Sequence, residues 1–341
     1  MKLDTQLGHQ GLGTVAEEAR RYERMGFGGA WTFEAGHDPF LPVALAAQAT
    51  GRLELGTNIA VAFARSPMSM AQAAWDLQKL SGGRFHLGLG TQVRAHIERR
   101  YSMPYDSPVP RLMDYVRCVR AIWHTFQTGD KPAYEGRFYR FVLMNPMFNG
   151  GPSDHPRIPI WIAGVNPIIS RAAGEVADGF HVHPLHSVSY LREVVIPAIE
   201  EGLKRAGRQR SDMELYSPVF AASGETQAAW DRSVEEVRRQ IAFYGSTPTY
   251  LPVLEHLGHG ETARELSALA RRGEWAGTAK LVPDAVLEQI AVIAKPADLA
   301  AAIQRRYEGI LQRVSLYFPI RAEEPESAWR EFAASFRQTA A

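Results

Sequence analysis

The chain has 341 residues, and its 38 basic and 37 acidic side chains leave a net charge of +1. Because acids and bases are interleaved, the sequence offers no electrostatic footprint for nucleic acid or for an anionic membrane. The single cysteine, Cys118, excludes an intramolecular disulfide and is typical of a reducing compartment. The N-terminus lacks an apolar leader, and no run of about 18 apolar residues occurs. We therefore expect a soluble, cytoplasmic globular protein.

The first third of the chain alternates between strand and helix patterns. Residues 13–25, for example, carry an apolar stripe of Val15, Ala19, Tyr22 and Met25 and stop at Gly26, which is typical of an amphipathic helix. The expected strands are 2–7, 30–33, 53–61 and 85–90, and the expected helices are 13–25, 39–50, 67–80 and 110–127. This order predicts a parallel sheet.

Two excursions interrupt the same alternation in the rest of the chain. Residues 129–157 are rich in glycine, proline and aromatics and predict an ordered insertion such as a hairpin, whereas residues 246–292 predict a helical one. The remaining expected strands are 159–163, 179–183, 213–222 and 313–318, and the remaining helices are 167–177, 189–206, 225–244, 296–307 and 326–338. Eight alternations predict one (β/α)8 TIM-barrel domain over residues 1–341, with insertions after the fourth and seventh helices. A doubly wound sheet is the competing fold.

Polar side chains follow the second expected strand, where barrel enzymes place their chemistry. The apolar run 30–33 ends in a turn that carries Glu34, His37 and Asp38. An imidazole titrates near neutral pH, so His37 at a strand end is a candidate proton donor, although a lone loop histidine is also a common surface residue.

Two histidines alternate on the sixth expected strand. Strand periodicity puts His181 and His183 on one face, which in a barrel is the interior near the mouth. They could form a polar wall that faces a ligand, be held structurally by nearby backbone, or bind a metal ion. A metal site needs a third ligand, for which His37, Asp38 and Glu34 are the candidates.

Glycine-containing turns follow three other strands. Gly88–Val93 begins as a dinucleotide fingerprint, but Val93 stands where the third glycine belongs, so close approach of a ligand to the backbone is favoured. Residues 163–166 end the fifth strand before a helix, which is an anion site by geometry or an ordinary turn. Asn58 ends the third strand, where its side chain is expected to face the barrel interior.

Together these segments resemble the bacterial luciferase-like flavin-dependent monooxygenase superfamily, and most closely its branch that uses the deazaflavin coenzyme F420. The resemblance spans most of the chain and rests on 34–42, 56–59 with 65–68, 81–91, 158–164 and 177–180. It implies a (β/α)8 barrel with the cofactor ring in the C-terminal mouth. It also implies a homodimer, since relatives are commonly dimers.

The resemblance implies roles for particular residues. A non-proline cis peptide beneath the ring matches Asn58–Ile59, and the cofactor phosphate matches the amides of Gly164, Val165 and Asn166. His37 would exchange a proton with the substrate while a hydride passes to or from C5 of the ring. The full cofactor-binding set that we expect is Asn58, Ile59, Thr91, Gln92, Ala163, Gly164, Val165 and Asn166, and the substrate-facing set is Glu34, Val93, His181 and His183.

One position departs from the pattern of F420-dependent sugar and alcohol dehydrogenases. Their glutamate after strand four corresponds to Val93, next to Gln92, and an apolar side chain cannot donate a proton. Glu34 is a candidate substitute. The second insertion, with Tyr250, His256, His259 and Trp275, matches the region that covers the mouth in the family, although its aromatics could instead be the core of its own helices.

The leading hypothesis is an F420-dependent oxidoreductase acting on a small organic substrate, without a metal ion. The first alternative is an FMN-dependent monooxygenase that uses oxygen and reduced flavin from a partner reductase. A metal-dependent barrel hydrolase built on His181, His183 and Asp38 is a third reading, and a non-catalytic F420 carrier is a fourth.

Overall fold

The computed structural model describes residues 1–8, 11–321 and 324–337 and forms a parallel barrel. Nine strand segments follow one another around it in the order β1-β14-β11-β10-β9-β6-β4-β3-β2, and each adjacent pair is parallel. Their bounds are β1 (Lys2–Leu3), β2 (Thr5–Gln6), β3 (Gly29–Thr32), β4 (Glu54–Thr57), β6 (Phe85–Gly90), β9 (Ile160–Gly164), β10 (Gly179–Val182), β11 (Glu214–Val219) and β14 (Arg313–Leu316). Because β1 and β2 are halves of one strand on either side of Asp4, the nine segments make eight strands. The predicted (β/α)8 barrel is confirmed.

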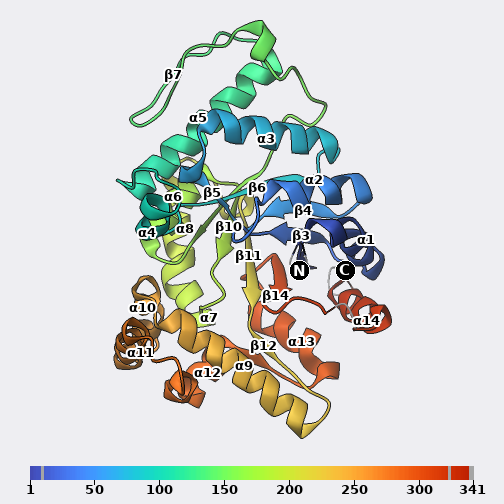
Figure 1. Cartoon of the computed structure of the whole chain (residues 1–341), viewed down its shortest axis with the longest axis vertical. Coiled ribbons are helices and arrows are strands. Elements are labelled where there is room, and N and C mark those ends of the chain that lie inside the picture. Colours follow the sequence, from blue (N-terminus) through green and yellow to red (C-terminus); the bar gives the residue numbers. More distant parts are fainter. Residues whose placement is uncertain (9–10, 322–323, 338–341) are drawn as a thin grey trace.

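Helices surround the barrel (Figure 1). The helices between and after the strands are α1 (Val15–Met25), α2 (Phe40–Ala49), α3 (Pro67–Leu80), α4 (Arg94–Arg99), α5 (Pro108–Thr128), α6 (Pro167–Val176), α7 (Val188–Tyr190), α8 (Ile196–Arg205), α9 (Gln227–Gly245), α13 (Pro296–Tyr307) and α14 (Glu326–Arg337). The start of α3 shows how sequence sets these bounds, because Pro67 opens the helix and the Ser66 hydroxyl accepts a hydrogen bond from the Ser69 amide at 3.1 Å. In the part of the chain that the structure describes, no helix is long and apolar enough to cross a bilayer.

Several expected elements are shorter or divided in the structure. The expected strand 53–61 divides into β4 and β5 (Ala60–Val61) at the Asn58–Ile59 peptide bond, which is cis, as the resemblance implies. The expected strand 213–222 divides into β11 and β12 (Ala221–Ala222). A π-helical turn, Leu191–Val195, lies between α7 and α8, where Pro197 has no N–H to donate to the helix ladder. The end of the expected helix 326–338 lies outside the described residues.

Both insertions have the expected character. In the first, β7 (Tyr134–Glu135) and β8 (Arg140–Phe141) form an antiparallel hairpin that projects from the barrel (Figure 1). In the second, β13 pairs with β12 in parallel and the helices gather at one end of the molecule. Its elements are α10 (Leu251–His256), α11 (Gly260–Arg272), α12 (Asp284–Ile290) and β13 (Val292–Ile293). Short 3-10 turns are Leu12–Thr14, Ala62–Ala64, Pro146–Phe148, Arg210–Asp212, Pro248–Tyr250 and Thr278–Leu281.

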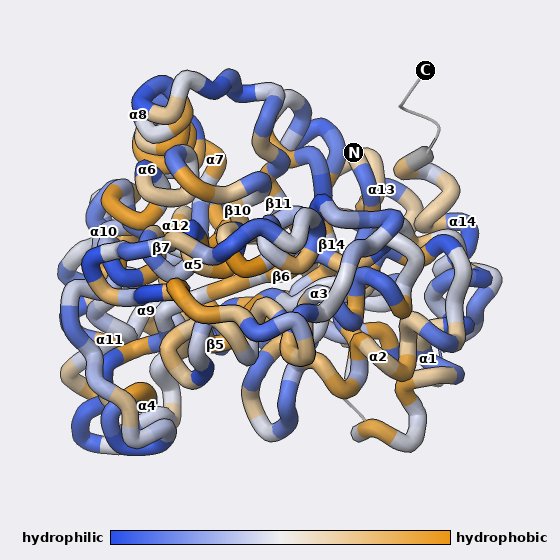
Figure 2. The backbone as a smooth tube through the Cα atoms, turned by 90° about the horizontal axis from the view of Figure 1, so that it is seen from above, coloured by the Kyte–Doolittle hydropathy of each residue, from blue (hydrophilic) through white to orange (hydrophobic). Residues whose placement is uncertain are grey.

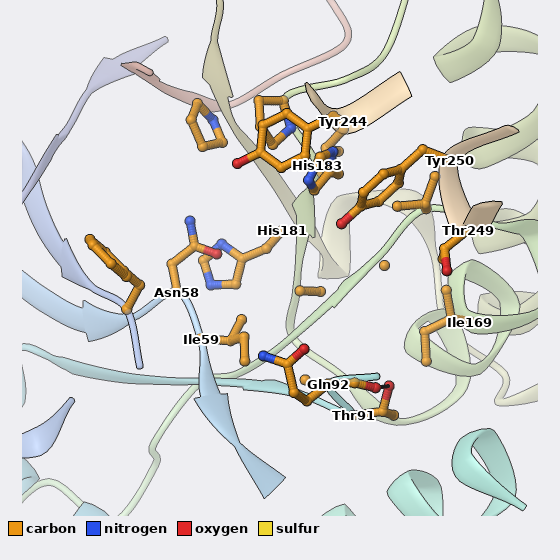
Figure 3. A pocket seen from close by; sticks show the side chains of 18 of the residues that line it. Asn58, Ile59, Thr91, Gln92, Ile169, His181, His183, Tyr244, Thr249 and Tyr250 are labelled. Carbon is orange, nitrogen blue, oxygen red and sulfur yellow. Dashed lines mark hydrogen bonds between the residues drawn. The ribbon is translucent and has the colours of Figure 1, made fainter. Parts of the chain in front are cut away.

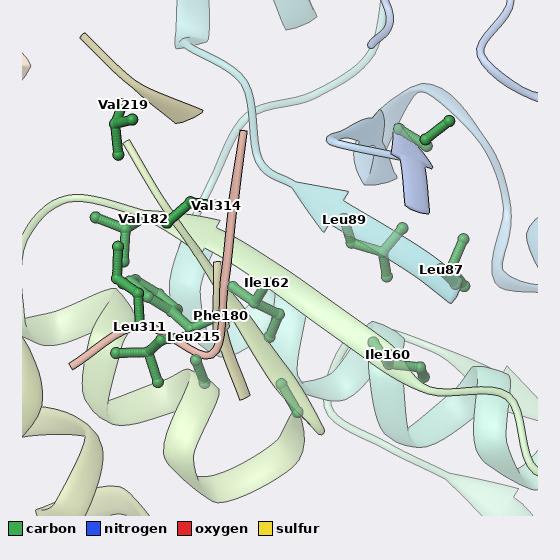
Figure 4. Packing of buried hydrophobic residues seen from close by; sticks show 14 of the residues in the cluster. Leu87, Leu89, Ile160, Ile162, Phe180, Val182, Leu215, Val219, Leu311 and Val314 are labelled. Atoms are coloured by element: carbon green, nitrogen blue, oxygen red, sulfur yellow. The ribbon is translucent and has the colours of Figure 1, made fainter. Parts of the chain in front are cut away.

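Because side chains alternate along each strand, one apolar set points outward from the barrel toward the helices, and a second set points into the barrel. Outward side chains such as Leu89, Ile162 and Phe180 are fully buried (Figure 4). The hydropathy colours accordingly show apolar strands in the interior and polar segments toward the periphery (Figure 2). At about 25 cal/mol per Å² of apolar surface removed from water, this layer is the main favourable contribution to folding.

The inside of the barrel is filled at the N-terminal ends of its strands. Arg313, at the start of β14, is completely buried, and its Nε donates to the Asp4 carboxylate at 2.6 Å while Nη1 pairs with Glu54. Next along the barrel, the rings of Trp31 and Trp161 pack with centroids 5.5 Å apart. Arg313 and these rings fill this end of the barrel interior.

Candidate functional site

A cavity of about 640 Å³ opens at the C-terminal ends of the barrel strands. Its walls come mostly from residues at or just after the ends of β2, β3, β4, β6, β9, β10, β11 and β14, with further residues from the segment before α5, from α5, α6 and the last turn of α9, and from the start of the second insertion. The described residues that line it are Gln6, Trp31, Phe33, Asn58, Ile59, Gly90, Thr91, Gln92, Val93, Tyr105, Pro108, Val109, Ala163, Gly164, Val165, Asn166, Ile169, His181, Val182, His183, Pro184, Pro218, Tyr244, Thr249, Tyr250, Tyr317, Phe318 and Pro319. This is where a TIM barrel places its active site.

All the residues expected to bind the cofactor line this one cavity, namely Asn58, Ile59, Thr91, Gln92, Ala163, Gly164, Val165 and Asn166. Figure 3 shows Asn58 and Ile59 beside His181, with Thr91 and Gln92 on the same side of the cavity as Ile59. The structure therefore brings together residues more than 100 positions apart. Their binding roles stay predictions.

The turn between β9 and α6 is held tightly in shape. The Asn166 side chain accepts hydrogen bonds from the Ile168 and Ile169 amides, both at 3.1 Å, and the Tyr190 hydroxyl donates to the Val165 carbonyl at 3.1 Å. Gly164 has no room for a side chain, because a Cβ there would lie 2.2 Å from Cγ2 of Ile169. The N-terminal end of α6 thus adjoins the cavity, and its partial positive charge suits an anionic group.

The turn after β6 presents an apolar side chain to the cavity. Gln92 has a left-handed φ of 56°, and its side-chain oxygen accepts a hydrogen bond from the Val93 amide at 3.0 Å. The Tyr105 hydroxyl donates to the Gln92 carbonyl at 3.3 Å. Val93 lines the cavity and is 41% exposed, so this part of the wall can donate no proton.

His181 lies deep in the cavity among aromatic rings. It stacks on Trp161 at 5.0 Å between centroids and meets Trp31 edge-on at 5.0 Å. Burial lowers the pKa of His181 well below its ordinary value, and repulsion from His86 and Arg313 adds to this effect. Both ring nitrogens are buried, and neither forms a well-aligned hydrogen bond within the described residues, although the Thr57 backbone beside the ring acts as an acceptor that favours the protonated form.

His183 lies at the rim of the same wall. Its Nδ1 accepts a hydrogen bond from the Leu185 amide at 3.1 Å, which leaves the ring proton on Nε2. The ring stacks on Tyr250 at 4.1 Å and contacts Tyr244 edge-on at 4.6 Å. Burial lowers the pKa of His183 to about 3, so the ring is neutral at physiological pH.

Comparison with known proteins decides the family. The family model described as luciferase-like monooxygenase matches residues 1–313. The chain belongs to this family. An uncharacterized protein of Mycobacterium tuberculosis is 46% identical over 324 residues, which are 95% of each chain. A 5,10-methylenetetrahydromethanopterin reductase of Archaeoglobus fulgidus is 27% identical over 285 residues, which are 82% of this chain and 80% of that protein.

Solved structures share the same barrel. The coenzyme F420-dependent tetrahydromethanopterin reductase from Methanopyrus kandleri superposes with a TM-score of 0.79 at 21% identity, covering 98% of this chain and 97% of that one. The long-chain alkane monooxygenase LadA superposes with a TM-score of 0.73 at 12% identity, covering 99% and 91%. Relatives and neighbours of this luciferase-like protein are thus oxidoreductases and monooxygenases, and the protein is an enzyme of the oxidoreductase class.

The polar turn after β3 does not line the cavity of this luciferase-like barrel. The Glu34 carboxylate accepts from the Val61 amide at 2.8 Å, from Arg65 at 2.7 Å and from the Tyr101 hydroxyl at 2.9 Å. Its side chain is only 5% exposed and braces the loop, so it does not occupy the substrate-facing position expected for it. His37 is exposed on this loop, and its role as proton donor stays a prediction.

The carboxylate proposed for a metal site is also engaged. Asp38 pairs with Arg65 at 2.7 Å and accepts from the Phe40 amide at 2.9 Å. Within the described ranges, no group of three or more histidine, cysteine, aspartate or glutamate side chains is arranged to hold a metal ion. The geometry therefore does not assemble the hydrolase site of His181, His183 and Asp38.

Sequence reasoning missed Tyr244 and Tyr317, two tyrosines that line the cavity and form what we call its far wall. Tyr317 follows Arg313 and Ser315 at strand spacing, so alternation along the expected strand 313–318 was a signal for it. Tyr244 lies in the last turn of α9, and only the tertiary fold brings it to the cavity. In the second insertion, Tyr250 lines the cavity as expected for a mouth-covering region, whereas Trp275 packs on Phe243 with ring centroids 5.8 Å apart. His256 and His259 are also not among the lining residues.

Proposed function

We propose that this protein is an F420-dependent oxidoreductase that transfers a hydride between C5 of the deazaflavin and a small organic substrate. The observation that carries the proposal is the single cavity in which all the expected cofactor-binding residues meet. The curated relatives support it, because those with named activities include 5,10-methylenetetrahydromethanopterin reductases and an F420-dependent glucose-6-phosphate dehydrogenase.

The residues present fit such a cofactor. Gly164 has no side chain, so a phosphate could approach the backbone amides of Gly164, Val165 and Asn166 just before α6, whereas the Ile168 and Ile169 amides are already capped by the Asn166 side chain. The His181 imidazole lines the cavity beside the Thr57 backbone and forms no well-aligned hydrogen bond within the described residues, so a ligand atom could pair with a ring nitrogen. When bound, F420 supplies the hydride donor or acceptor.

The chain itself supplies binding, orientation and proton handling. The rings of His183, Tyr244 and Tyr250 pack against one another at the cavity wall and would limit the access of water to a bound ligand. Val93 cannot exchange a proton, and the Glu34 carboxylate is held by three donors. His37 on the exposed loop is our proposed proton donor or acceptor for the substrate.

An FMN-dependent monooxygenase is the second candidate, because monooxygenases share the fold. It would use oxygen and a partner reductase, and either function is compatible with a homodimer. Two assays separate the candidates. The first follows F420 reduction without oxygen in the presence of a panel of alcohols, and the second follows oxygen consumption with reduced FMN and the same compounds.

The proposal predicts enzyme-dependent loss of oxidized F420 absorbance in the first assay and no oxygen uptake above background in the second. Oxygen uptake that requires both the protein and an organic substrate, without F420 turnover, would establish the monooxygenase instead.

A further inference from the structure

The cavity wall carries no charged side chain among the described residues. Its 28 lining residues include no lysine, arginine, aspartate or glutamate. Burial lowers the pKa of both His181 and His183 and keeps them neutral, while burial raises the pKa of Tyr250 to about 12 and that of Tyr317 further still. A charged group on a substrate inside this cavity would lose its hydration without gaining a partner, which is costly.

Charged residues near the mouth are paired with one another. Arg65 binds Glu34 and Asp38, both at 2.7 Å. Arg111 binds Asp106 at 2.9 Å. These guanidinium groups form their ion pairs outside the cavity, although Nε of Arg111 has no hydrogen-bond partner within the described residues, and neither side chain belongs to the cavity wall. The backbone at the start of α6 is the one feature described above that suits an anion, and the proposed cofactor phosphate occupies it.

In the chain of hydrogen bonds at the far wall, one of the two tyrosine hydroxyl hydrogens is not used. The Gln240 amide nitrogen donates to the Tyr317 hydroxyl at 2.7 Å, and the Tyr317 and Tyr244 hydroxyls lie 2.8 Å apart. Two phenols carry two hydroxyl hydrogens, and the bond between them uses one. Because Gln240 donates, it accepts neither, so the second hydrogen is available to an acceptor in the cavity that both tyrosines line.

Both phenols are fixed by their surroundings. Gln6 donates to the Tyr317 carbonyl at 2.7 Å, and the Tyr317 ring packs on Phe220 with centroids 4.6 Å apart. Tyr244 lies against His183 and Tyr250 (Figure 3). Fixed side chains bind a ligand without a large loss of rotamer entropy, so the remaining hydroxyl hydrogen is a preorganised donor.

We propose that the substrate is an uncharged, predominantly apolar compound, aromatic or aliphatic, whose carbonyl or hydroxyl oxygen accepts the remaining hydrogen of the Tyr244–Tyr317 pair. This inference rests on the proposed function, because the ligand is a substrate only if the protein is that enzyme. Binding of a neutral ligand to the tyrosine pair does not itself require F420. It excludes sugar phosphates and carboxylic acids from the cavity, because no cationic side chain faces them.

The test is calorimetric binding of matched probes to the purified full chain, with and without F420. Acetophenone is the neutral carbonyl probe, 4-acetylbenzoate adds one carboxylate, and ethylbenzene removes the carbonyl oxygen. Cyclohexanone and 2-heptanone extend the neutral set. We expect at least one neutral ketone to bind, and acetophenone to bind at least about tenfold more tightly than 4-acetylbenzoate.

The variant that tests the donor is the double substitution Tyr244→Phe with Tyr317→Phe, since either phenol alone retains a hydroxyl hydrogen. We expect ketone affinity to fall about five- to tenfold, as for one lost hydrogen bond, while ethylbenzene affinity changes less than about twofold. Tyr139→Phe, a phenol in the first insertion that does not line the cavity, controls for removal of a hydroxyl. Thermal unfolding of each variant checks that it is folded.

Three results would overturn the inference: tighter binding of 4-acetylbenzoate, equal losses of ketone and ethylbenzene affinity in the double variant, or failure of every neutral ketone to bind. If the double variant does not fold, the parent protein decides, and weaker binding of acetophenone than of ethylbenzene to the parent contradicts the inference, because a hydroxyl donor would favour the ketone. Failure of F420 to bind, with the ketone results intact, would contradict only the proposed function.

Discussion

A single side chain changes the proton chemistry expected of this barrel. Val93 lines the cavity where the resemblance to F420-dependent dehydrogenases implies a glutamate, and Glu34 is held by backbone, Arg65 and Tyr101 outside the cavity. The structure thus offers no free carboxylate at either position. The remaining candidate from the sequence is His37, and the tyrosine pair of the far wall is a neutral donor that can hold a substrate oxygen.

His37→Ala tests the proton role directly. We expect turnover with F420 to fall about 10²–10⁴-fold, the usual effect of losing a general acid or base. F420 affinity, measured by fluorescence quenching, should change less than about threefold, because His37 does not line the cavity.

His96→Ala is the matched control, since His96 is an exposed histidine on α4 that also lies outside the cavity wall. Equal turnover in the His37 and His96 variants would assign the proton to another group or to solvent.

At the scale of elements, the β9–α6 turn carries the strongest steric constraint of the site. Gly164 precedes the Asn166 cap and faces Ile169 of α6 at a distance that excludes a Cβ. The chain must therefore shift there if Gly164 gains a methyl group, and the start of α6 would shift with it.

Gly164→Ala should weaken F420 binding by about tenfold or more, because overpacking displaces the backbone that we propose for the phosphate. Adding Ile169→Ala removes the atoms that the new Cβ would meet and should restore part of the affinity. The measurement is F420 titration of the single and double variants beside Ile169→Ala alone. If the Gly164→Ala variant binds as the parent does, the phosphate lies elsewhere.

At the scale of the whole molecule, the filled N-terminal end of the barrel links stability to pH. Burial alone would raise the pKa of Glu54, but attraction to Arg313 and the hydrogen bond from Lys2 outweigh burial and hold the pKa at about 2, below the ordinary 4.5. A lowered carboxyl pKa contributes stability above the unfolded value, and this contribution is lost as pH falls toward the folded value.

The free energy of unfolding should therefore fall between pH 6 and pH 3 by about 2 kcal/mol more in the parent protein than in Glu54→Gln. Urea unfolding at a series of pH values measures this difference. The glutamine retains the shape of the side chain but does not titrate. Parallel pH profiles for the two proteins would show that Glu54 does not control the acid response.

Much of the architecture could be predicted because it follows from local sequence patterns. The alternation of apolar and polar residues, together with turn residues, located every barrel strand. Both insertions were recognised because they interrupt the alternation of strands and helices. The break at Asp4 was missed, since it depends on pairing with neighbouring strands, whereas the break at Asn58–Ile59 was expected only through the family resemblance.

The site was predictable where residues follow a strand end and less so where distant segments meet. His181 and His183 reach the cavity as strand alternation predicts. Glu34 does not, because its direction depends on Arg65 and Tyr101, which are far away in the sequence. Tyr244 joins Tyr317 across 73 positions, and no local pattern reports that contact.

The most direct test of the central claim is a side-by-side fluorescence titration of the purified protein with F420 and with FMN. An F420 dissociation constant in the micromolar range or below, with FMN bound at least about tenfold more weakly, is the result that an F420-dependent oxidoreductase predicts. Tight FMN binding with weak F420 binding would contradict it and make the protein a flavin-dependent monooxygenase.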